Sequence, residues 1–267
     1  MDLPNLAGVR LARDRSDLAL AAGEAPLAGG TWLYSEPQAH LTGLVDLTTL
    51  GWPDWTERAD GGLSIAATCA IAELVRIPEV GRPAARLFRQ GAESLLQSFK
   101  VWNTATIGGN IVTALAAGAL IGVTAALDAE LVIWTADGGE RRQRAEAFVL
   151  GQRATTLAHG EVLRSIEIGP VPLAARTAFR RIALSPLGRA GTVVAGRRDA
   201  DGTTVLSITG GTARPEVLRF PEPPGPEHLL AAIDSIRSWF TDAHGAADWR
   251  AAMSRTLAEA VREELAA

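Results

Sequence analysis

Two short stretches decide the fold of this chain, Ala28-Gly29-Gly30-Thr31-Trp32-Leu33 and Thr106-Ile107-Gly108-Gly109-Asn110-Ile111. In both, the glycine pair is followed by a residue with a small polar side chain, which is Thr31 in the first stretch and Asn110 in the second. Because glycine has no Cβ, successive backbone N–H groups can converge on an anion, and Thr31, Thr106 and Asn110 add hydrogen bonds to phosphate or ribose oxygens. A single pair is most often only a tight turn. Two of them predict loops that embrace one pyrophosphate.

The common nucleotide-binding loops are absent from the sequence. Neither Gly-x-Gly-x-x-Gly nor Gly-x-x-x-x-Gly-Lys occurs anywhere in the chain. These motifs mark the two standard phosphate loops of dinucleotide-binding and P-loop proteins. A nucleotide bound by this chain therefore needs a different fold.

Composition limits the class of protein. The 267 residues are 47% apolar and 21% charged, with a net charge of -4, which predicts one or two folded domains and argues against a nucleic-acid partner. The single cysteine, Cys69, supplies neither a disulfide nor an iron–sulfur cluster. No histidine lies three or four residues from another, so we expect no metal site.

The sequence predicts a cytoplasmic protein that does not enter the membrane. The start, Met1 to Asn5, has no positive segment followed by an apolar run, so no export signal is expected. The uncharged segment 108–127 has about the 20 residues that span a bilayer, but it is rich in Ala, Gly and Thr and contains Asn110. We interpret it as a buried loop followed by a helix.

Short helices and strands alternate in the first two thirds of the chain. Ser16 is expected to cap a helix over 17–22, and a second helix is expected over 86–99. Asp137-Gly138-Gly139 predicts a tight hairpin, because its turn requires positive φ. The other expected elements are strands at 26–28, 44–47, 63–67, 130–135 and 161–168, and a helix over 71–75 capped by Thr68.

The last third has a different pattern, which indicates a second domain. Longer strands are expected over 177–184, 192–198 and 203–209, followed by a proline-rich spacer at 221–226 and two helices. The final helix carries an apolar stripe expected to pack on the sheet, formed by Trp249, Met253, Leu257, Val261 and Leu265.

The stretches 27–33 and 103–111 resemble the two flavin-binding signatures of a known family, the FAD-binding (medium) subunits of molybdenum hydroxylases. This family includes the flavoproteins of xanthine dehydrogenase and carbon monoxide dehydrogenase. The resemblance covers nearly the whole chain. Further similar segments occur in the family's order at 44–50, 65–68, 73–74, 127–129, 148–151, 160–163 and 210–211, and in the Trp249 helix.

The resemblance implies an α+β fold. A PCMH-type FAD-binding domain is expected over residues 1–170, with subdomains of about 1–55 and 56–170. A smaller domain of antiparallel sheet and helices, similar to the C-terminal domain of the carbon monoxide dehydrogenase flavoprotein, is expected over 175–267.

The resemblance also implies one non-covalent FAD, with the pyrophosphate against the first glycine loop and the second loop reaching toward the flavin and ribityl region. No catalytic residue is expected, since the chemistry belongs to the flavin. Electrons would arrive from an iron–sulfur subunit that serves a molybdopterin-binding subunit, and would leave to NAD⁺ or another acceptor. The implied cofactor-binding residues are Ala28, Gly29, Gly30, Thr31, Trp32, Leu33, Leu96, Thr106, Ile107, Gly108, Gly109 and Asn110.

Departures from the family pattern leave two alternatives open. The usual Pro-Ala-Gly-Asp after the second loop reads Ala116-Ala117-Gly118-Ala119, which removes a carboxylate that would bind the cofactor's sugar. One alternative is therefore a flavin-free assembly subunit of the same fold. The other is a self-contained flavoprotein oxidase, for which His40 or Cys69 would have to form a covalent link.

Overall fold

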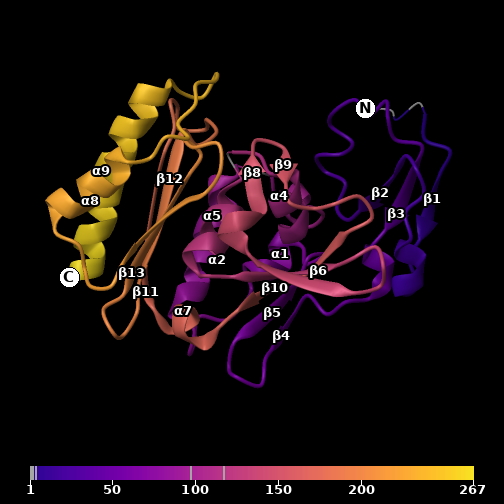
Figure 1. Ribbon diagram of the computed structural model, residues 1–267, viewed down its shortest axis with the longest axis horizontal. Helices are drawn as coiled ribbons and strands as arrows, with labels where there is room; N and C mark the ends of the chain where they lie inside the picture. The colour runs from indigo at the N-terminus through magenta and orange to yellow at the C-terminus, as the bar shows by residue number, and fades with distance from the viewer. Residues whose placement is uncertain (1–2, 4, 97, 117) are drawn as a thin grey trace.

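The computed structural model describes residues 3, 5–96, 98–116 and 118–267. Three of its sheets follow one another along the long axis, from the N-terminal strands at one end to helices α8 and α9 at the other (Figure 1). The two larger of these sheets are antiparallel, and helices lie between and beside them. The α+β fold expected from the sequence is confirmed.

The first sheet is small and parallel, and it leads directly into the first glycine pair. Strands β1 (Gly8–Leu11) and β2 (Glu24–Leu27) both pair with β3 (Gly43–Asp46), so the order is β1-β3-β2. A short 3-10 helix, η2 (Thr48–Leu50), follows β3. Because β2 ends at Leu27, the Gly29-Gly30 pair begins at the edge where the parallel strands end.

The helix expected over 17–22 is wrong. A 3-10 helix, η1 (Arg15–Leu18), lies there instead, and Asp14 rather than Ser16 caps it, accepting a hydrogen bond from the Ser16 N–H. Side chains from the flanking strands β1 and β2 form hydrogen bonds with backbone groups that a longer helix would need for its own hydrogen bonds. Arg10 donates to the carbonyl of Ala19 at 2.8 Å, and the Glu24 carboxylate accepts from the Ala21 N–H at 2.8 Å.

The second sheet has the order β4-β5-β10-β6-β7 and forms the middle of the molecule. The hairpin expected at 137–139 is confirmed as the turn between β6 and β7. The sheet consists of strands β4 (Trp55–Glu57), β5 (Leu63–Ala66), β6 (Glu130–Trp134), β7 (Glu140–Arg144) and β10 (Val162–Ile168). The same part of the chain contains the helices α1 (Ile71–Leu74), η3 (Pro83–Ala85), α2 (Arg86–Ser94), α3 (Phe99–Trp102), α4 (Ile107–Thr113), α5 (Ala119–Ala126) and α6 (Ala145–Phe148). It also contains a small hairpin of β8 (Val149–Gly151) and β9 (Ala154–Thr155).

The expected cap of α1 and the expected end of α2 are wrong. Helix α1 has no side-chain cap, since its N-cap residue is Ala70 rather than Thr68. The helix expected over 86–99 ends at Ser94, because Leu96 adopts a left-handed φ of 54° and the Ser94 hydroxyl donates back to the Gly91 carbonyl. A separate helix, α3, then begins after Ser98.

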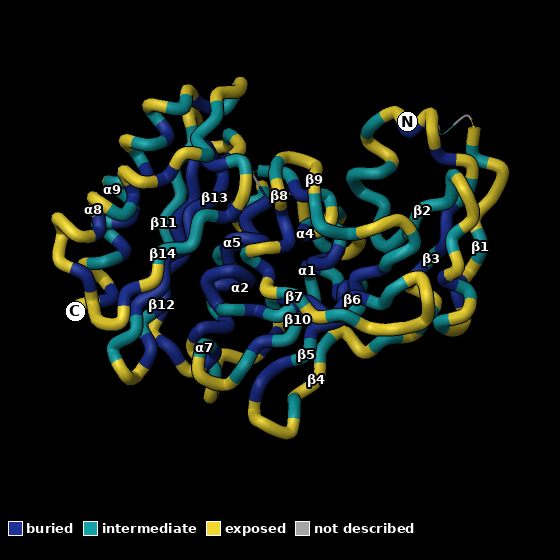
Figure 2. Tube along the Cα trace, viewed as in Figure 1, coloured by how far each residue is buried: buried dark blue, intermediate teal, exposed yellow. Residues whose placement is uncertain are grey.

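The uncharged segment 108–127 was expected to be a buried loop followed by a helix, but it forms two helices, α4 and α5. All eight residues of α5 are buried, and this helix lies at the dark centre of Figure 2. Ala117 is outside the described residues. Among the residues described, no helix combines the length and the apolar character needed to cross a membrane.

The third sheet is an antiparallel meander, β11 (Arg176–Ile182), β12 (Thr192–Arg198), β13 (Thr204–Thr209) and β14 (Glu216–Phe220), joined to the second sheet through α7 (Pro170–Ala174). Helices α8 (Pro226–Asp234) and α9 (Ala247–Ala266) cover one face, and α5 covers the other. Glycines permit both contacts. A Cβ on Gly122 of α5 would lie 2.6 Å from the Thr209 hydroxyl, and one on Gly196 would lie 2.5 Å from Val261. Strand β13 is therefore buried along its whole length.

The apolar stripe expected on α9 is only half right. Val261 and Leu265 are buried against the sheet, but the N-terminal half of the helix buries Arg250 and Ser254 in place of Trp249 and Met253. Most of these polar groups have partners, although the Nε of Arg250 has none among the described residues. Arg250 donates to the Phe240 carbonyl at 2.9 Å, and the Ser254 hydroxyl bonds the Thr192 hydroxyl of β12 at 2.7 Å.

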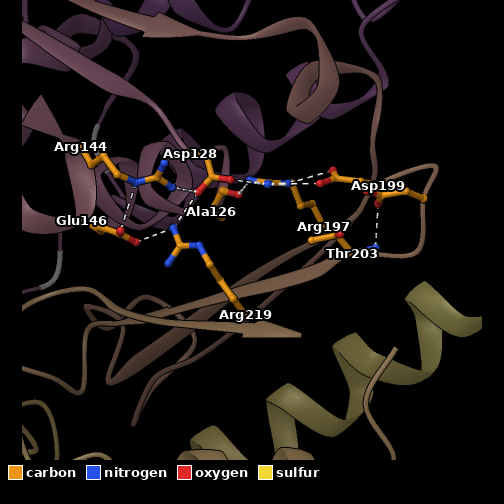
Figure 3. A network of polar contacts seen from close by, with 9 residues as sticks. Ala126, Asp128, Arg144, Glu146, Arg197, Asp199, Thr203 and Arg219 are labelled. Atoms are coloured by element: carbon orange, nitrogen blue, oxygen red, sulfur yellow. Dashed lines mark hydrogen bonds and ion pairs between the residues drawn. The ribbon is translucent and has the colours of Figure 1, made fainter. Parts of the chain in front are cut away.

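A network of charged side chains ties the third sheet to the connection between α5 and β6 (Figure 3). Arg197 of β12 is 3% exposed and contacts Asp128, the Ala126 carbonyl and Asp199. Arg219 of β14 donates to the same Asp128 at 2.7 Å. Burial raises the pKa of Asp128, but the hydrogen bonds from Arg197 and Arg219 outweigh it and hold that pKa below its usual value. A paired, buried charge cluster of this kind fixes how the two sheets meet.

Candidate functional site

The two glycine pairs line one cleft of about 500 Å³, here called the glycine-pair cleft. One wall is the end of β2 with residues 28–33. The opposite wall is the N-terminal half of α4 with Ala105 and Thr106 before it, and β10 contributes Val162 and Leu163. The loops predicted to embrace one ligand are thus side by side.

The first glycine pair is in contact with the chain that precedes the second. A Cβ on Gly29 would lie 1.8 Å from the Thr104 carbonyl oxygen, so only glycine fits at position 29. Gly30 has a left-handed φ of 65°, which favours glycine as well. From there residues 31–34 form a single helical turn, closed by the Tyr34 N–H donating to the Gly30 carbonyl at 2.9 Å.

The backbone N–H groups of this first loop are free. Those of residues 29–33 donate to no partner among the described residues. Buried or half-buried N–H groups without a partner are costly and rare, and successive ones at the start of a helical turn form an anion-binding arrangement. The first loop can therefore receive a phosphate as it stands.

The second glycine pair is built differently, since it forms the first turn of α4 and its N–H groups are already used. The Ile107 N–H donates to the Cys69 carbonyl at 3.0 Å and the Gly108 N–H to the Ala67 carbonyl at 2.9 Å. The Gly109 N–H donates to the hydroxyl of Thr106, which caps the helix. No backbone donor of this pair is left for an anion. A Cβ on Gly108 would lie 2.5 Å from both Cβ and O of Ala67, so this glycine permits close packing.

The structure brings most of the expected cofactor-binding residues into the cleft and leaves two outside its lining. Ile107 is 0% exposed and belongs to the hydrophobic core. Leu96 is 37% exposed at the end of α2. Those that line the cleft are Ala28, Gly29, Gly30, Thr31, Trp32, Leu33, Thr106, Gly108, Gly109 and Asn110.

Two polar atoms of the cleft residues are buried without a partner. They are the side-chain oxygen Oδ1 of Asn110 and the indole Nε1 of Trp32. A buried acceptor and a buried donor left unpaired in this way cost free energy until a ligand or water satisfies them. Both residues line the cleft, but these two atoms are themselves inaccessible in the free chain.

Sequence reasoning missed several residues that line the cleft. The polar ones are Gln38, Thr113, Arg153 and Glu161, and apolar ones include Leu157 and Leu163. His40, which the sequence suggested only as a possible flavin link, lines the cleft as well. Arg153 and Leu157 lie between the segments 148–151 and 160–163, which resemble segments of the flavin-binding family. That resemblance was the signal that could have indicated these two residues. Glu161 is paired with Arg141 at 2.6 Å, and this hydrogen bond lowers the pKa of the carboxyl.

Cys69 is a poor candidate for a flavin link. Its side chain is fully buried and does not line the cleft, and burial raises the pKa of its thiol far above the usual value. A thiol held protonated in this way is unreactive, because the thiolate is the nucleophile.

The chain is similar to proteins of known family and known structure. A family model described as the FAD binding domain in molybdopterin dehydrogenase matches residues 16–172, more than half of the chain. A search of the curated proteins gave no significant match.

Solved structures with the same fold cover almost the whole chain. Carbon monoxide dehydrogenase from Hydrogenophaga pseudoflava matches with a TM-score of 0.84 and 22% identity, over 98% of this chain and 97% of that one. CO dehydrogenase from Oligotropha carboxidovorans gives 0.86 and 18%, over 98% of each. Quinoline 2-oxidoreductase from Pseudomonas putida 86 gives 0.82 and 19%, over 100% and 98%. At these identities the likeness establishes the fold.

Proposed function

Because the chain belongs to the family of FAD-binding domains of molybdopterin dehydrogenases, we propose that it holds FAD in the glycine-pair cleft as the electron-transfer subunit of a molybdenum hydroxylase complex. The observation that carries the assignment of the site is the row of free N–H groups at 29–33 facing a cleft of about 500 Å³. A volume of this order suits a cofactor-sized ligand.

The residues present fit FAD. The N–H groups of the first loop, which have no partner among the described residues, suit the two charged phosphates, and Asn110, which lines the cleft, supplies an amide side chain for a ribityl or ribose hydroxyl. Leu157 and Leu163 supply apolar surface for a ring. Bound FAD accepts and releases electrons, so this chain has only to bind it, orient it and keep water away from it.

We further propose that the partners are an iron–sulfur subunit and a molybdopterin-binding subunit, with NAD⁺ or another acceptor receiving the electrons, in a cytoplasmic complex of the xanthine dehydrogenase type. The fold-matched structures support the molybdenum partner, since one of them is described as lacking the Mo-pyranopterin moiety of its molybdenum cofactor. The proposed division into 1–170, with subdomains meeting near residue 55, and 175–267 is supported by the change of sheet on either side of α7.

The flavin-free alternative rested on the missing carboxylate at position 119. Ala119 is 1% exposed and packs with Val193 of β12 and with Ala190 in the loop before it, and it does not line the cleft. The replacement extends an apolar contact between the sheets, while the free donors of the first loop stay intact. The geometry therefore favours a flavin-binding subunit.

Reconstitution tests this proposal. The purified chain is incubated with FAD and desalted, and the flavin retained per folded chain is measured from the visible spectrum. We expect retention near one FAD per chain, and the same yield from a Gly109→Ala variant. A chain that is folded by circular dichroism but retains no flavin would contradict the proposal.

A further inference from the structure

Arg153 is a cation in the glycine-pair cleft that no carboxylate among the described residues neutralises. It lies in the turn between β8 and β9 and is exposed, and its guanidinium has no hydrogen-bond or ion-pair partner among the described residues. The other titratable side chains at the cleft are His40 and Glu161, and Glu161 is already paired with Arg141. The only fixed positive charge among the residues described as lining the cleft is therefore on Arg153.

The backbone at Arg153 is held in an unfavourable conformation. Its φ is 58°, in the left-handed region that residues with a Cβ rarely adopt. The Arg153 N–H donates at 2.8 Å to the carbonyl of Ala114, which is itself left-handed, with a φ of 50°, at the C-terminal end of α4. Strain of this kind persists only where the surroundings impose it, and it gathers at binding sites. The hydrogen bond fixes the turn to the helix that forms one wall of the cleft.

The guanidinium lies over the ring of Trp32 in the first glycine loop. The Cζ atom of Arg153 is 5.8 Å from the centre of the Trp32 ring, within the range of a cation–π contact. Trp32 belongs to the segment whose N–H groups are free. The cation therefore meets the segment that carries the free donors at Trp32, although the two residues are more than a hundred positions apart in the chain.

We propose that Arg153, supported on Trp32, binds the diphosphate of FAD together with the free N–H groups of residues 29–33. This inference rests on the proposed function and adds to it the residue that supplies the charge. A diphosphate carries two negative charges, and a planar guanidinium with five donors suits its oxygens better than an ammonium does. Glu161 cannot oppose this binding strongly, because Arg141 compensates its charge.

The test measures the affinity of the full chain for FAD at two ionic strengths. Arg153→Gln removes the charge and keeps most of the side chain's length. Arg13→Gln is the matched control, since Arg13 is also exposed but does not line the cleft. At about 0.1 M salt we expect Arg153→Gln to weaken FAD binding by about tenfold or more, and Arg153→Lys by less. At about 1 M salt, where the Debye length falls to about 3 Å, the difference from wild type should shrink.

Each result is decisive. The inference is overturned if Arg153→Gln binds FAD as wild type does, or if it loses the same factor at both salt concentrations, which would indicate lost packing on Trp32 instead of lost charge. If wild type itself binds no FAD, the proposed function fails too, and that failure is visible in the wild-type titration alone. Circular dichroism of each variant establishes that the fold is kept.

Discussion

The two glycine pairs look alike in the sequence, but their backbone N–H groups are used differently in the structure. In each, the first glycine permits close packing, because a Cβ at Gly29 would strike the Thr104 carbonyl and one at Gly108 would strike Ala67. The difference lies in the N–H groups. The first loop leaves them free, whereas those of the second pair donate to the carbonyls of Ala67 and Cys69 or to the Thr106 hydroxyl.

The two walls of the cleft therefore have different roles in binding. The first loop supplies backbone donors suited to an anion, and the second supplies a rigid helix start that presents the Asn110 side chain. A glycine pair is thus evidence for close backbone approach, and the destination of its hydrogen bonds decides whether it binds phosphate. Substitutions in the two pairs should separate stability from binding.

Gly29→Ala should have the largest effect, on stability. The added methyl would lie 1.8 Å from a backbone oxygen that cannot move without shifting the segment before α4. We expect the free energy of unfolding to fall by about 3 kcal/mol or more, as for severe overpacking. Urea denaturation followed by circular dichroism measures it. A loss below about 1 kcal/mol would mean that the two segments are not in contact.

Gly30→Ala should act mainly on binding. Its φ of 65° costs an alanine about 1–2 kcal/mol, and the nearest atoms to the new Cβ belong to the movable ring of Tyr34. In a variant that still folds, the free N–H groups of the first loop will be positioned less precisely. FAD affinity should therefore fall about tenfold or more. Fluorescence titration with FAD measures it, and an unchanged affinity would argue against the first loop as the phosphate site.

Thr106→Ala should have a moderate effect on stability. It removes the side chain that caps α4 and leaves the Gly109 N–H without its acceptor. Loss of such a cap costs about 1 kcal/mol. Thermal unfolding measures the change, and Thr106→Ser, which keeps the hydroxyl, should restore most of it. Equal losses in both variants would assign the effect to the methyl group.

Gly109→Ala should have the smallest effect. Its added Cβ meets only the Thr106 hydroxyl, at 3.0 Å, and alanine favours a helix over glycine by up to about 1 kcal/mol. We expect stability and FAD affinity to stay close to wild type. A large loss of FAD in this variant, with Gly30→Ala unaffected, would reverse the roles of the two pairs.

The sequence predicts the fold class and the hairpin at 137–139, and ten of its twelve expected cofactor-binding residues line the cleft, because these depend on local turn chemistry and on a family pattern with fixed order. It does not predict where hydrogen bonds between distant segments go. The N–H groups of Ile107 and Gly108 are taken by carbonyls about forty residues earlier in the chain. Likewise, the helix expected over 17–22 fails because Arg10 and Glu24 bind its backbone.

Arg153 shows the same limit at the site. Nothing local in Gly151-Gln152-Arg153 distinguishes this arginine from the many others in the chain. Its importance comes from a hydrogen bond to Ala114 and a contact with Trp32, both contributed by residues far away in the sequence.

Amide hydrogen exchange with and without FAD, followed residue by residue, tests the central claim most directly. Free N–H groups exchange quickly and bonded ones slowly. We predict that the amides of residues 29–33 exchange fast in the free chain and are protected by FAD, while those of 107–109 are protected in both states. Fast exchange at 107–109 that FAD slows, with 29–33 unchanged, would contradict the account.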